Sequence, residues 1–301
     1  MTTTPFSVTL ADQGLIRVSG DDAAQFLHNL LTNDIIHLPP DGARHAALCT
    51  AKGRMIASFL IWREAADFWL MLSADILPGI LKKLSMYVLR SKVRLVDASA
   101  ERRLIGVVGA ALAPATPMTT AALPEGTAIR LDAGRCLWVL NAGAFSAGAG
   151  DLPAGLPPAA PLADWHLAEI AAGIPRITAA TQEAFTPQMA NYELPAVGGV
   201  SFQKGCYPGQ EIVARTQYLG KVKRRMFRVA QEADFPPGTD VFTPEAGDQH
   251  CGAVVLTAPA PTGGYESLLV VQASAAQSGQ IHLGRPDGPL ARLLALPYAV
   301  D

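Results

Sequence analysis

In the first part of the chain, apolar residues follow two spacings in turn, first that of a strand and then that of a helix. Residues 14–18 form a short apolar run, which predicts a strand. The polar stretch 19–22 then offers side chains that can cap a helix. The spacing that follows is that of one helix face, and residues 32–34 end the helix in a polar turn. The apolar face of this predicted helix consists of Ala23, Phe26, Leu27, Leu30 and Leu31.

A series of strand-like runs comes next. Residues 63–67 are polar and suit the loop of a hairpin between two of these runs. A second helix is predicted after Asp75, with Leu77, Ile80, Leu81, Leu84 and Val88 on one face. The strands are predicted at 45–50, 55–62, 68–73, 93–97 and 104–109. The order strand, helix, strand, strand, helix, strand is that of a ferredoxin-like unit.

The middle of the chain, residues 110–160, is rich in Ala, Pro and Gly. Within it, the apolar run 136–140 predicts a buried strand, and 154–161 is predicted to be a loop or linker. A helix is then expected to begin at a cap formed by Asp164 and to stop at Gly173 and Pro175.

From about residue 222 the helical period disappears. Short apolar or alternating runs are separated by turns rich in Pro and Gly, which favours a small antiparallel β-barrel or sandwich. The predicted strands lie at 226–230, 251–257, 267–272 and 290–296. We therefore expect three parts: an α+β unit at 1–99, a second at 100–221 and a β-domain at 222–301.

Composition adds that the chain can bury a sizeable core. Of its 301 residues, 50% are hydrophobic and 17% are charged, which suits two or three packed units. No apolar run reaches the roughly 18 residues that a membrane span needs. The N-terminus lacks the basic and apolar pattern of a secretory signal. We expect a cytoplasmic protein without a membrane partner.

The four cysteines are far apart and form no C-x-x-C pair. This spacing argues against a disulfide framework, a zinc site and an intrinsic iron–sulfur cluster, so we expect no resident metal and no disulfide-linked partner. Cys49 and Cys136 lie in apolar runs and are interpreted as small buried hydrophobic residues. Cys251 follows His250, and we interpret this pair as turn packing.

Positive charge is concentrated between Lys204 and Arg228. Seven basic residues face one acidic residue, Glu211, so this stretch carries +6 while the whole chain carries −2. Such a concentration suggests an anionic partner, such as the glutamate carboxylates of a folate or the phosphates of tRNA. A solvated surface is the alternative. The basic residues are Lys204, Arg215, Lys221, Lys223, Arg224, Arg225 and Arg228.

Cys206 lies in this stretch between Gly205 and the turn sequence Tyr207-Pro-Gly209. Lys204 is two residues away, and in an extended segment both side chains would point to one face. A nearby cation and an open approach favour a reactive thiolate. A structural cysteine in a tight turn is the alternative. Similarly, Tyr207, Gln210 and Glu211 either take part in a site or only fix the loop.

The sequence K-G-C-Y-P-G-Q-E at 204–211 resembles the signature of the YgfZ family, folate-binding relatives of the aminomethyltransferase (T-protein) of the glycine cleavage system. T-P-Q-M-A-N at 186–191 and A-R-T-Q-Y-L-G-K-V-K-R-R at 214–225 also match, and weaker similarity runs through most of the chain. The resemblance implies an α+β fold of two ferredoxin-like α/β units around a central cavity, followed by a small antiparallel β-barrel.

The resemblance also implies a function. It implies a protein that binds tetrahydrofolate or a related reduced folate and supports iron–sulfur cluster assembly or repair, with client or assembly proteins, including tRNA-modifying enzymes, as partners. The hallmark thiol is Cys206, supported by Lys204. The candidate residues for binding the folate or lining its cavity are Trp165, Asn33, Asp34, Tyr207, Gln210, Glu211, Arg215 and Arg225.

Three positions depart from the pattern of the relatives. Gln13 stands where a folate-stacking aromatic residue is expected. Ala57 or Ser58 stands where the aminomethyltransferases carry an aspartate, so transfer of an aminomethyl group lacks its carboxylate. Ala171 replaces a glutamate that can bind the pterin, while Glu169 lies two residues earlier. Two alternatives stay open: a folate-dependent one-carbon transferase, and a non-catalytic module that docks RNA or a protein.

Overall fold

The structure is a computed structural model that describes all residues except 1–3, 110–112, 145–154, 221 and 301. The chain divides into two compact units, each made of several segments. Unit 1 contains residues 1–28, 35–44 and 59–165, and unit 2 contains 29–34, 45–58 and 166–301. The predicted three-part division at residues 99 and 221 remains a prediction.

One five-stranded sheet has the predicted ferredoxin-like order. Its strands follow the order β3-β4-β5-β2-β6, and β5 and β6 each pair antiparallel with β2. Without the edge strand β3, the order β4-β5-β2-β6 is that of a ferredoxin-like sheet. The units divide within β3 and β4. The strands are β2 (Gln13–Ser19), β3 (Ala43–Cys49), β4 (Met55–Glu64), β5 (Asp67–Ser73) and β6 (Arg94–Asp97).

Both predicted helices of this region are present. The first is α1 (Ala23–Leu30) and the second is α2 (Leu77–Ser85). In α2, Leu77, Ile80 and Leu84 are buried, as their spacing predicts. The short 3-10 helix η1 (Ser99–Glu101) then leads into the next strand.

The second sheet lies within unit 1 and is antiparallel throughout, in the order β1-β7-β10-β9-β8. The predicted strands at 104–109 and 136–140 correspond to β7 and β10, while the hairpin of β8 and β9 was not predicted. Cys136 is in the core of this sheet, as expected. The elements are β1 (Phe6–Thr9), β7 (Arg102–Val108), β8 (Thr119–Leu123), β9 (Gly126–Arg130), β10 (Arg135–Asn141) and the 3-10 helix η2 (Ala142–Ala144).

Helix α3 (Leu162–Ala172) begins earlier than predicted. Asp164 was expected to cap it, but Asp164 lies inside the first turn, where its carboxylate suits the positive end of the helix dipole. The predicted stop is confirmed: Gly173 has a φ of +66°, and Tyr298 Oη donates a hydrogen bond of 2.6 Å to its carbonyl oxygen. Residues 155–161 of the predicted loop 154–161 are described, and they form neither a helix nor a named strand, as predicted.

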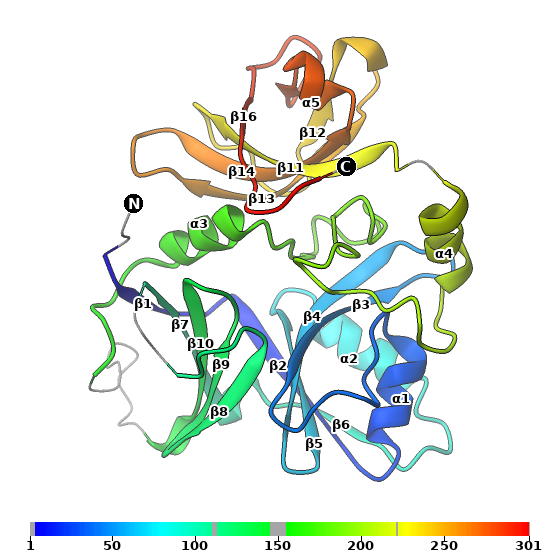
Figure 1. The fold of residues 1–301 in the computed structure, drawn as a ribbon, viewed down its shortest axis with the longest axis vertical. Coiled ribbons are helices and arrows are strands. Elements are labelled where there is room, and N and C mark those ends of the chain that lie inside the picture. Colours follow the sequence, from blue (N-terminus) through cyan, green and yellow to red (C-terminus); the bar gives the residue numbers. More distant parts are fainter. Residues whose placement is uncertain (1–3, 110–112, 145–154, 221, 301) are drawn as a thin grey trace. The chain divides into compact units, whose positions relative to one another are not determined.

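The predicted C-terminal β-domain is a six-stranded, curled antiparallel sheet in unit 2 (Figure 1). The order is β15-β12-β13-β14-β11-β16, and its core includes Cys251 and Val229. The elements are β11 (Arg224–Gln231), β12 (Asp240–Phe242), the 3-10 helix η3 (Pro244–Ala246), β13 (Gly252–Pro259), β14 (Tyr265–Gln272), the short helix α5 (Ala275–Ser278), β15 (His282–Leu283) and β16 (Arg292–Leu294).

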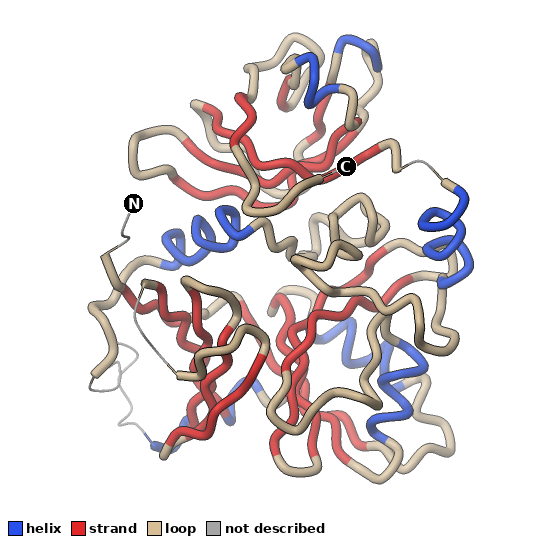
Figure 2. The backbone as a smooth tube through the Cα atoms, viewed as in Figure 1, coloured by secondary structure: helices blue, strands red, loops and turns tan. Residues whose placement is uncertain are grey.

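Two helices in unit 2 were not predicted: the short α5 and a longer one. Residues 173–209 form loops and turns, and α4 (Gln210–Leu219) follows them (Figure 2). Gly209, with a φ of +83°, is the residue that precedes this helix. Only Val213 of α4 is buried, so the helix has no apolar core face for a sequence pattern to reveal. None of the helices within the described ranges has the length and apolarity that crossing a membrane demands.

Candidate functional site around Cys206

Cys206 differs from the other three cysteines in its accessibility. All four thiols are unpaired; Cys206 is exposed, whereas Cys49, Cys136 and Cys251 are buried. Burial raises the pKa of the Cys49 thiol to about 12 and that of Cys136 to about 11, because a thiolate is poorly solvated in the core. Cys206 is therefore the cysteine that an external reactant can reach.

Lys204 is buried and bonded to the backbone, so it is not an exposed neighbour of the thiol. Its side chain is 8% exposed, and Nζ donates a hydrogen bond of 2.6 Å to the carbonyl oxygen of Leu31. Nζ also lies 4.8 Å from the centre of the Tyr207 ring. Burial lowers the pKa of Lys204 to about 8, although the charges of Asp34 and Cys206 oppose this shift. This amine therefore loses its proton more readily than an exposed lysine does.

The loop at 31–34 holds the segment that leads to Cys206. Thr32 Oγ1 donates to the carbonyl oxygen of Gly199 at 2.7 Å. Asn33 Nδ2 donates to the carbonyl oxygens of His45 and Gly198, each at 2.7 Å, and its Oδ1 accepts the N–H of Asp34 at 2.8 Å. Asn33 therefore fixes backbone geometry, since its amide group is committed to these bonds.

The turn after Cys206 is fixed by close packing. Tyr207 is buried, which raises the pKa of its phenol, and its hydroxyl has no hydrogen-bond partner within the described residues. Gly209 has a φ of +83°, and a Cβ there would lie 2.3 Å from the carbonyl oxygen of Thr50. A glycine is therefore required at the position where the chain turns into α4.

Of the three predicted candidates on α4, two are exposed and Gln210 is half-buried. Gln210 and Glu211 form the first turn, where the Glu211 carboxylate favours the positive end of the helix dipole. Glu211 and Arg215 are exposed. They lie on the helix that follows the thiol turn, whereas the Lys204 amine donates a hydrogen bond to the carbonyl oxygen of Leu31.

The basic stretch is not one surface. Lys204 is buried, and Arg225 Nη1 donates to Glu193 Oε1 at 2.5 Å and to the carbonyl oxygen of Gln188 at 3.0 Å. Burial raises the pKa of Glu193, which Arg225 opposes. Arg228 pairs with Glu266 at 2.5 Å. The sequence count therefore overstates the charge available to a partner, because three of the seven cations are bonded inside the fold.

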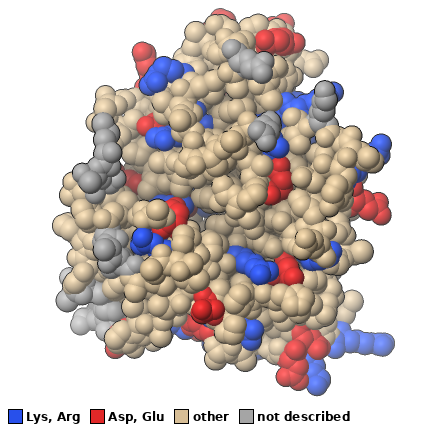
Figure 3. All heavy atoms as spheres, viewed as in Figure 1, with Lys and Arg blue, Asp and Glu red and all other residues tan. Residues whose placement is uncertain are grey.

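The four remaining cations differ in exposure. Arg215 and Lys223 are exposed, Arg224 is half-buried, and Lys221 lies outside the described residues. On the face drawn in Figure 3, basic and acidic side chains are interspersed and form no continuous basic patch.

The candidate folate contacts on α3 differ in character. Trp165 is 1% exposed and fills the space left by Gly106, where a Cβ would lie 2.3 Å from the indole ring. The Arg135 guanidinium lies 5.6 Å from the same ring. Glu169 is also buried, with Oε2 3.9 Å from Arg176 Nη2, yet this oxygen has no hydrogen-bond partner within the described residues. Trp165 is thus a core residue here, and Glu169 carries an unsatisfied acceptor.

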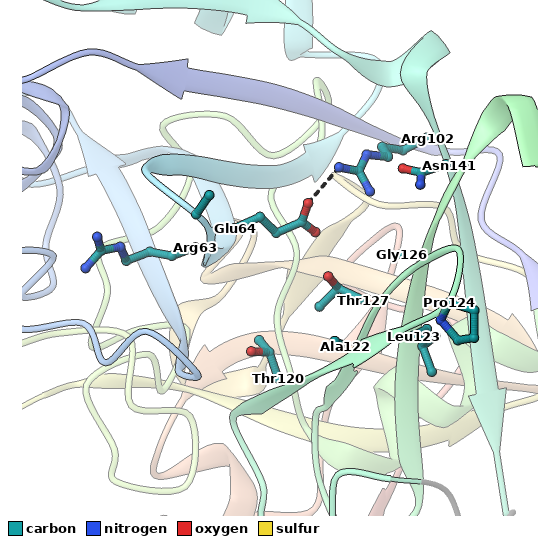
Figure 4. Close-up of a pocket in the computed structure, with 11 residues that line it drawn as sticks. Arg63, Glu64, Arg102, Thr120, Ala122, Leu123, Pro124, Gly126, Thr127 and Asn141 are labelled. Atoms are coloured by element: carbon teal, nitrogen blue, oxygen red, sulfur yellow. Dashed lines mark hydrogen bonds and ion pairs between the residues drawn. The ribbon is translucent and has the colours of Figure 1, made fainter.

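A shallow pocket of about 440 Å³ lies elsewhere, within unit 1 (Figure 4). The Glu64 carboxylate there pairs with Arg102 at 2.6 Å, and Arg102 stacks over Trp69 at 4.5 Å. Arg63, Thr120, Thr127 and Asn141 also contribute polar groups to its lining. None of the residues predicted to act in the site contributes to this pocket.

The structure thus gathers Lys204, Cys206, Tyr207 and the 31–34 loop in one place. Arg225 belongs to the buried ion pair with Glu193. Sequence reasoning missed Glu193 and the Leu31 carbonyl, because the first bonds to a residue 32 positions away and the second to one 173 positions away. The one signal in the sequence was that Glu193 carries a charged carboxylate among apolar neighbours.

The comparisons with known proteins agree with this architecture. Residues 7–138 match the GCVT N-terminal domain. The crystal structure of glycine cleavage system aminomethyltransferase T from Bartonella henselae superposes with a TM-score of 0.74 at 16% identity, covering 99% of this chain and 87% of that one. The chain therefore has the aminomethyltransferase T fold, which confirms the predicted fold class.

Two relatives named tRNA-modifying protein YgfZ are each 30% identical to the chain. The protein from Vibrio vulnificus aligns over 98% of this chain and 93% of its own length, and that from Photobacterium profundum over 98% and 92%. The chain belongs to the YgfZ family, as the sequence 204–211 predicts.

Proposed function

We propose that this protein is a folate-binding member of the YgfZ family that supports the assembly or repair of iron–sulfur clusters, including those of enzymes that modify tRNA, through the thiol of Cys206. The main observation behind this proposal is that Cys206 is exposed. It lies on a segment that is held in place by hydrogen bonds to the 31–34 loop. The names of the two relatives support the link to tRNA modification.

The thiol suits the handling of iron as cargo. A thiolate is a soft ligand that iron–sulfur clusters prefer, and such clusters usually take four of them. Among the described residues, no three His, Cys, Asp or Glu side chains are placed to hold a metal ion together. Cys206 would therefore act together with ligands that a client protein contributes.

One residue on α3, Glu169, has a group that suits the binding of a folate. The Glu169 carboxylate has a buried oxygen without a donor, and the aminopyrimidine edge of a pterin presents N–H groups that such an oxygen accepts. Glu169 would hold this edge, taking the place of the glutamate that Ala171 replaces. When bound, a reduced folate supplies a carrier for one-carbon units. Trp165 would support α3 from the core rather than stack on the ring.

The chain does not offer the carboxylate of an aminomethyltransferase at the aligned position. Ala57 is buried, and Ser58 Oγ accepts the backbone N–H of Ile177 at 2.9 Å. Neither side chain can take up a proton as a carboxylate does. This arrangement favours cluster maintenance over aminomethyl transfer.

Titration with tetrahydrofolate by calorimetry tests the folate part. Wild type should bind, and Glu169→Gln should bind about tenfold more weakly, since a charged hydrogen bond is lost. Asp164→Asn, which neutralises an exposed carboxylate on the same helix, is the control and should bind as wild type. Equal affinity of wild type and Glu169→Gln would remove Glu169 from the site.

Activity of iron–sulfur enzymes in cells lacking their own YgfZ-family gene tests the cluster part. The wild-type chain should restore activity, and Cys206→Ala should not. Cys251→Ala removes a buried thiol and serves as the matched control. Restoration by Cys206→Ala equal to that by wild type would contradict the proposed role of the thiol.

A further inference from the structure

Helix α4 displays apolar side chains to solvent immediately after the Cys206 turn. Ile212 is 43% exposed, Tyr218 68% and Leu219 85%. At about 100° per residue, these three and Arg215 lie on the side of the helix opposite to the buried Val213. We call these four residues the α4 surface. Soluble proteins rarely expose several large apolar residues together unless a partner covers them.

The α4 surface is held in position by the residues beneath it. Gln188 Nε2 donates a hydrogen bond of 2.7 Å to the carbonyl oxygen of Val213 on the inner side of the helix. A Cβ on Gly53 would lie 3.2 Å from Ile212 Cβ, so the neighbouring loop packs closely against the helix. Phe202 meets the Tyr218 ring edge-on at 5.9 Å. The apolar side chains are thus presented outward by a fixed support.

The charges around the α4 surface identify the kind of partner. Arg215 lies within it, Lys52 precedes Gly53, and Lys223 follows the helix; all three are exposed, and Glu211 is the acidic residue of α4. A second copy of the chain would bring like charges together, which disfavours self-association. RNA would be attracted by the cations, but its bases stack on aromatic side chains, whereas Ile212 and Leu219 are aliphatic.

We propose that the α4 surface docks a client protein through a segment whose apolar side chains are flanked by carboxylates. Apolar groups would cover Ile212 and Leu219, and the carboxylates would face Arg215, Lys52 and Lys223. This inference rests on the proposed function, because a client bound to α4 lies next to the exposed thiol of Cys206, three residues before Gly209. Docking would then bring the client's own cluster ligands to that thiol.

Fluorescence anisotropy with two labelled helical peptides tests the inference. One peptide carries leucines at helical spacing flanked by glutamates, and the other has lysines in place of the glutamates. The full-length protein should bind the acidic peptide saturably and the basic one about tenfold more weakly. Ile212→Gln/Leu219→Gln should lose about tenfold in affinity for the acidic peptide. Leu290→Gln, an exposed leucine on the C-terminal domain, should not.

A charge exchange sharpens the test. Arg215→Glu should weaken the acidic peptide and strengthen the basic one, because the complementary charge has been reversed. The bound acidic peptide should also slow the alkylation of Cys206 by iodoacetamide. Binding of both peptides with equal affinity, or of neither, would overturn the inference.

Two other occupants give distinct outcomes. Tight binding of an unmodified tRNA transcript that Ile212→Gln/Leu219→Gln weakens would assign the surface to nucleic acid. Sedimentation of wild type as a dimer, and of Ile212→Gln/Leu219→Gln as a monomer, would assign it to a second copy. Either result overturns the inference.

The experiment also separates this inference from the proposed function. Cys206→Ala should bind the acidic peptide as wild type does while failing to restore iron–sulfur enzymes in cells. If Cys206→Ala fails in cells and no peptide binds, the inference alone is wrong. If peptides bind as expected and Cys206→Ala restores activity, the proposed function is wrong.

Discussion

The segment 198–209 and helix α4 are adjacent in sequence, but the first directs polar groups inward and the second directs side chains outward. The first directs its polar groups inward: Lys204 bonds to Leu31, and the carbonyl oxygens of Gly198 and Gly199 accept bonds from the 31–34 loop. The second directs apolar and charged side chains outward, with Val213 as its buried contact. Cys206 lies between them and is exposed.

Because of this difference, we expect the inward segment to contribute to stability and α4 to contribute to partner binding. Substitutions in the inward segment, or at the buried cations, should lower the free energy of unfolding, because they leave bonded groups without partners. Substitutions on α4 should leave that free energy nearly unchanged and alter only what the surface binds. The four predictions that follow test this division, beginning with the largest expected effect.

Within the basic stretch, Arg225 and Lys223 form a matched pair of cations, one buried and one exposed. Arg225→Ala should lower the free energy of unfolding by about 3–5 kcal/mol, because it leaves the buried Glu193 carboxylate without its partner. Lys223→Ala should change it by less than about 0.5 kcal/mol. Urea denaturation measures both. Equal losses in the two variants would break the distinction between inward and outward cations.

Gly209→Ala should destabilise the turn before α4 by about 2–3 kcal/mol, since the new Cβ would clash with the Thr50 carbonyl oxygen. Gly279→Ala is the control: it has the same left-handed conformation, with a φ of +69°, yet nothing lies within 4 Å of the added Cβ. That variant should lose only about 1 kcal/mol, the cost of the backbone conformation. Thermal denaturation compares the two, and a Gly209→Ala variant as stable as Gly279→Ala would refute the close contact.

The buried amine of Lys204 predicts a dependence of stability on pH. Its pKa lies near 8 in the folded protein and near its ordinary value of 10.5 in the unfolded chain. Between these values the unfolded chain binds more protons, so the free energy of unfolding should rise with pH across the window. The rise should be about 1–3 kcal/mol relative to Lys204→Met, which cannot titrate. Parallel profiles for wild type and Lys204→Met in urea denaturation would show that this amine is not buried.

The smallest effect is expected on α4. Leu219→Gln should change the free energy of unfolding by less than about 0.5 kcal/mol, because this leucine is 85% exposed and Gln is a good helix former. Leu27→Gln, which buries an amide in the core, provides the contrast in the same urea titration. A large loss in Leu219→Gln would mean that this side chain packs within the protein.

The sequence predicted most of the sheets because their apolar residues face a core. The face of α2 follows directly from spacing, and so do β11, β13, β14 and β16 of the C-terminal domain, whereas the very short β12 and β15 were not predicted. Helix α4 escaped prediction because its large apolar residues face solvent, so their positions carry no core period. Asp164 was predicted to be the cap of α3 but lies in its first turn. A carboxylate is favoured at both positions, so the sequence alone does not distinguish them.

For the site, the motif predicted the position of the thiol but not its support. The spacing of Lys204 and Cys206 suggested two side chains on one face, whereas one is buried and the other exposed. Nothing local to the motif indicates that Lys204 bonds to Leu31, a residue 173 positions away. Likewise, a count of charges could not reveal that Arg225 and Arg228 are paired within the fold.

The most direct test of the account is the profile of modified nucleosides in total tRNA, measured by mass spectrometry in cells that lack their own YgfZ-family gene. Wild type and Cys251→Ala should restore the modifications that depend on iron–sulfur enzymes, and Cys206→Ala, expressed to the same level, should not. A profile restored in full by Cys206→Ala would contradict the central claim that this exposed thiol performs the function.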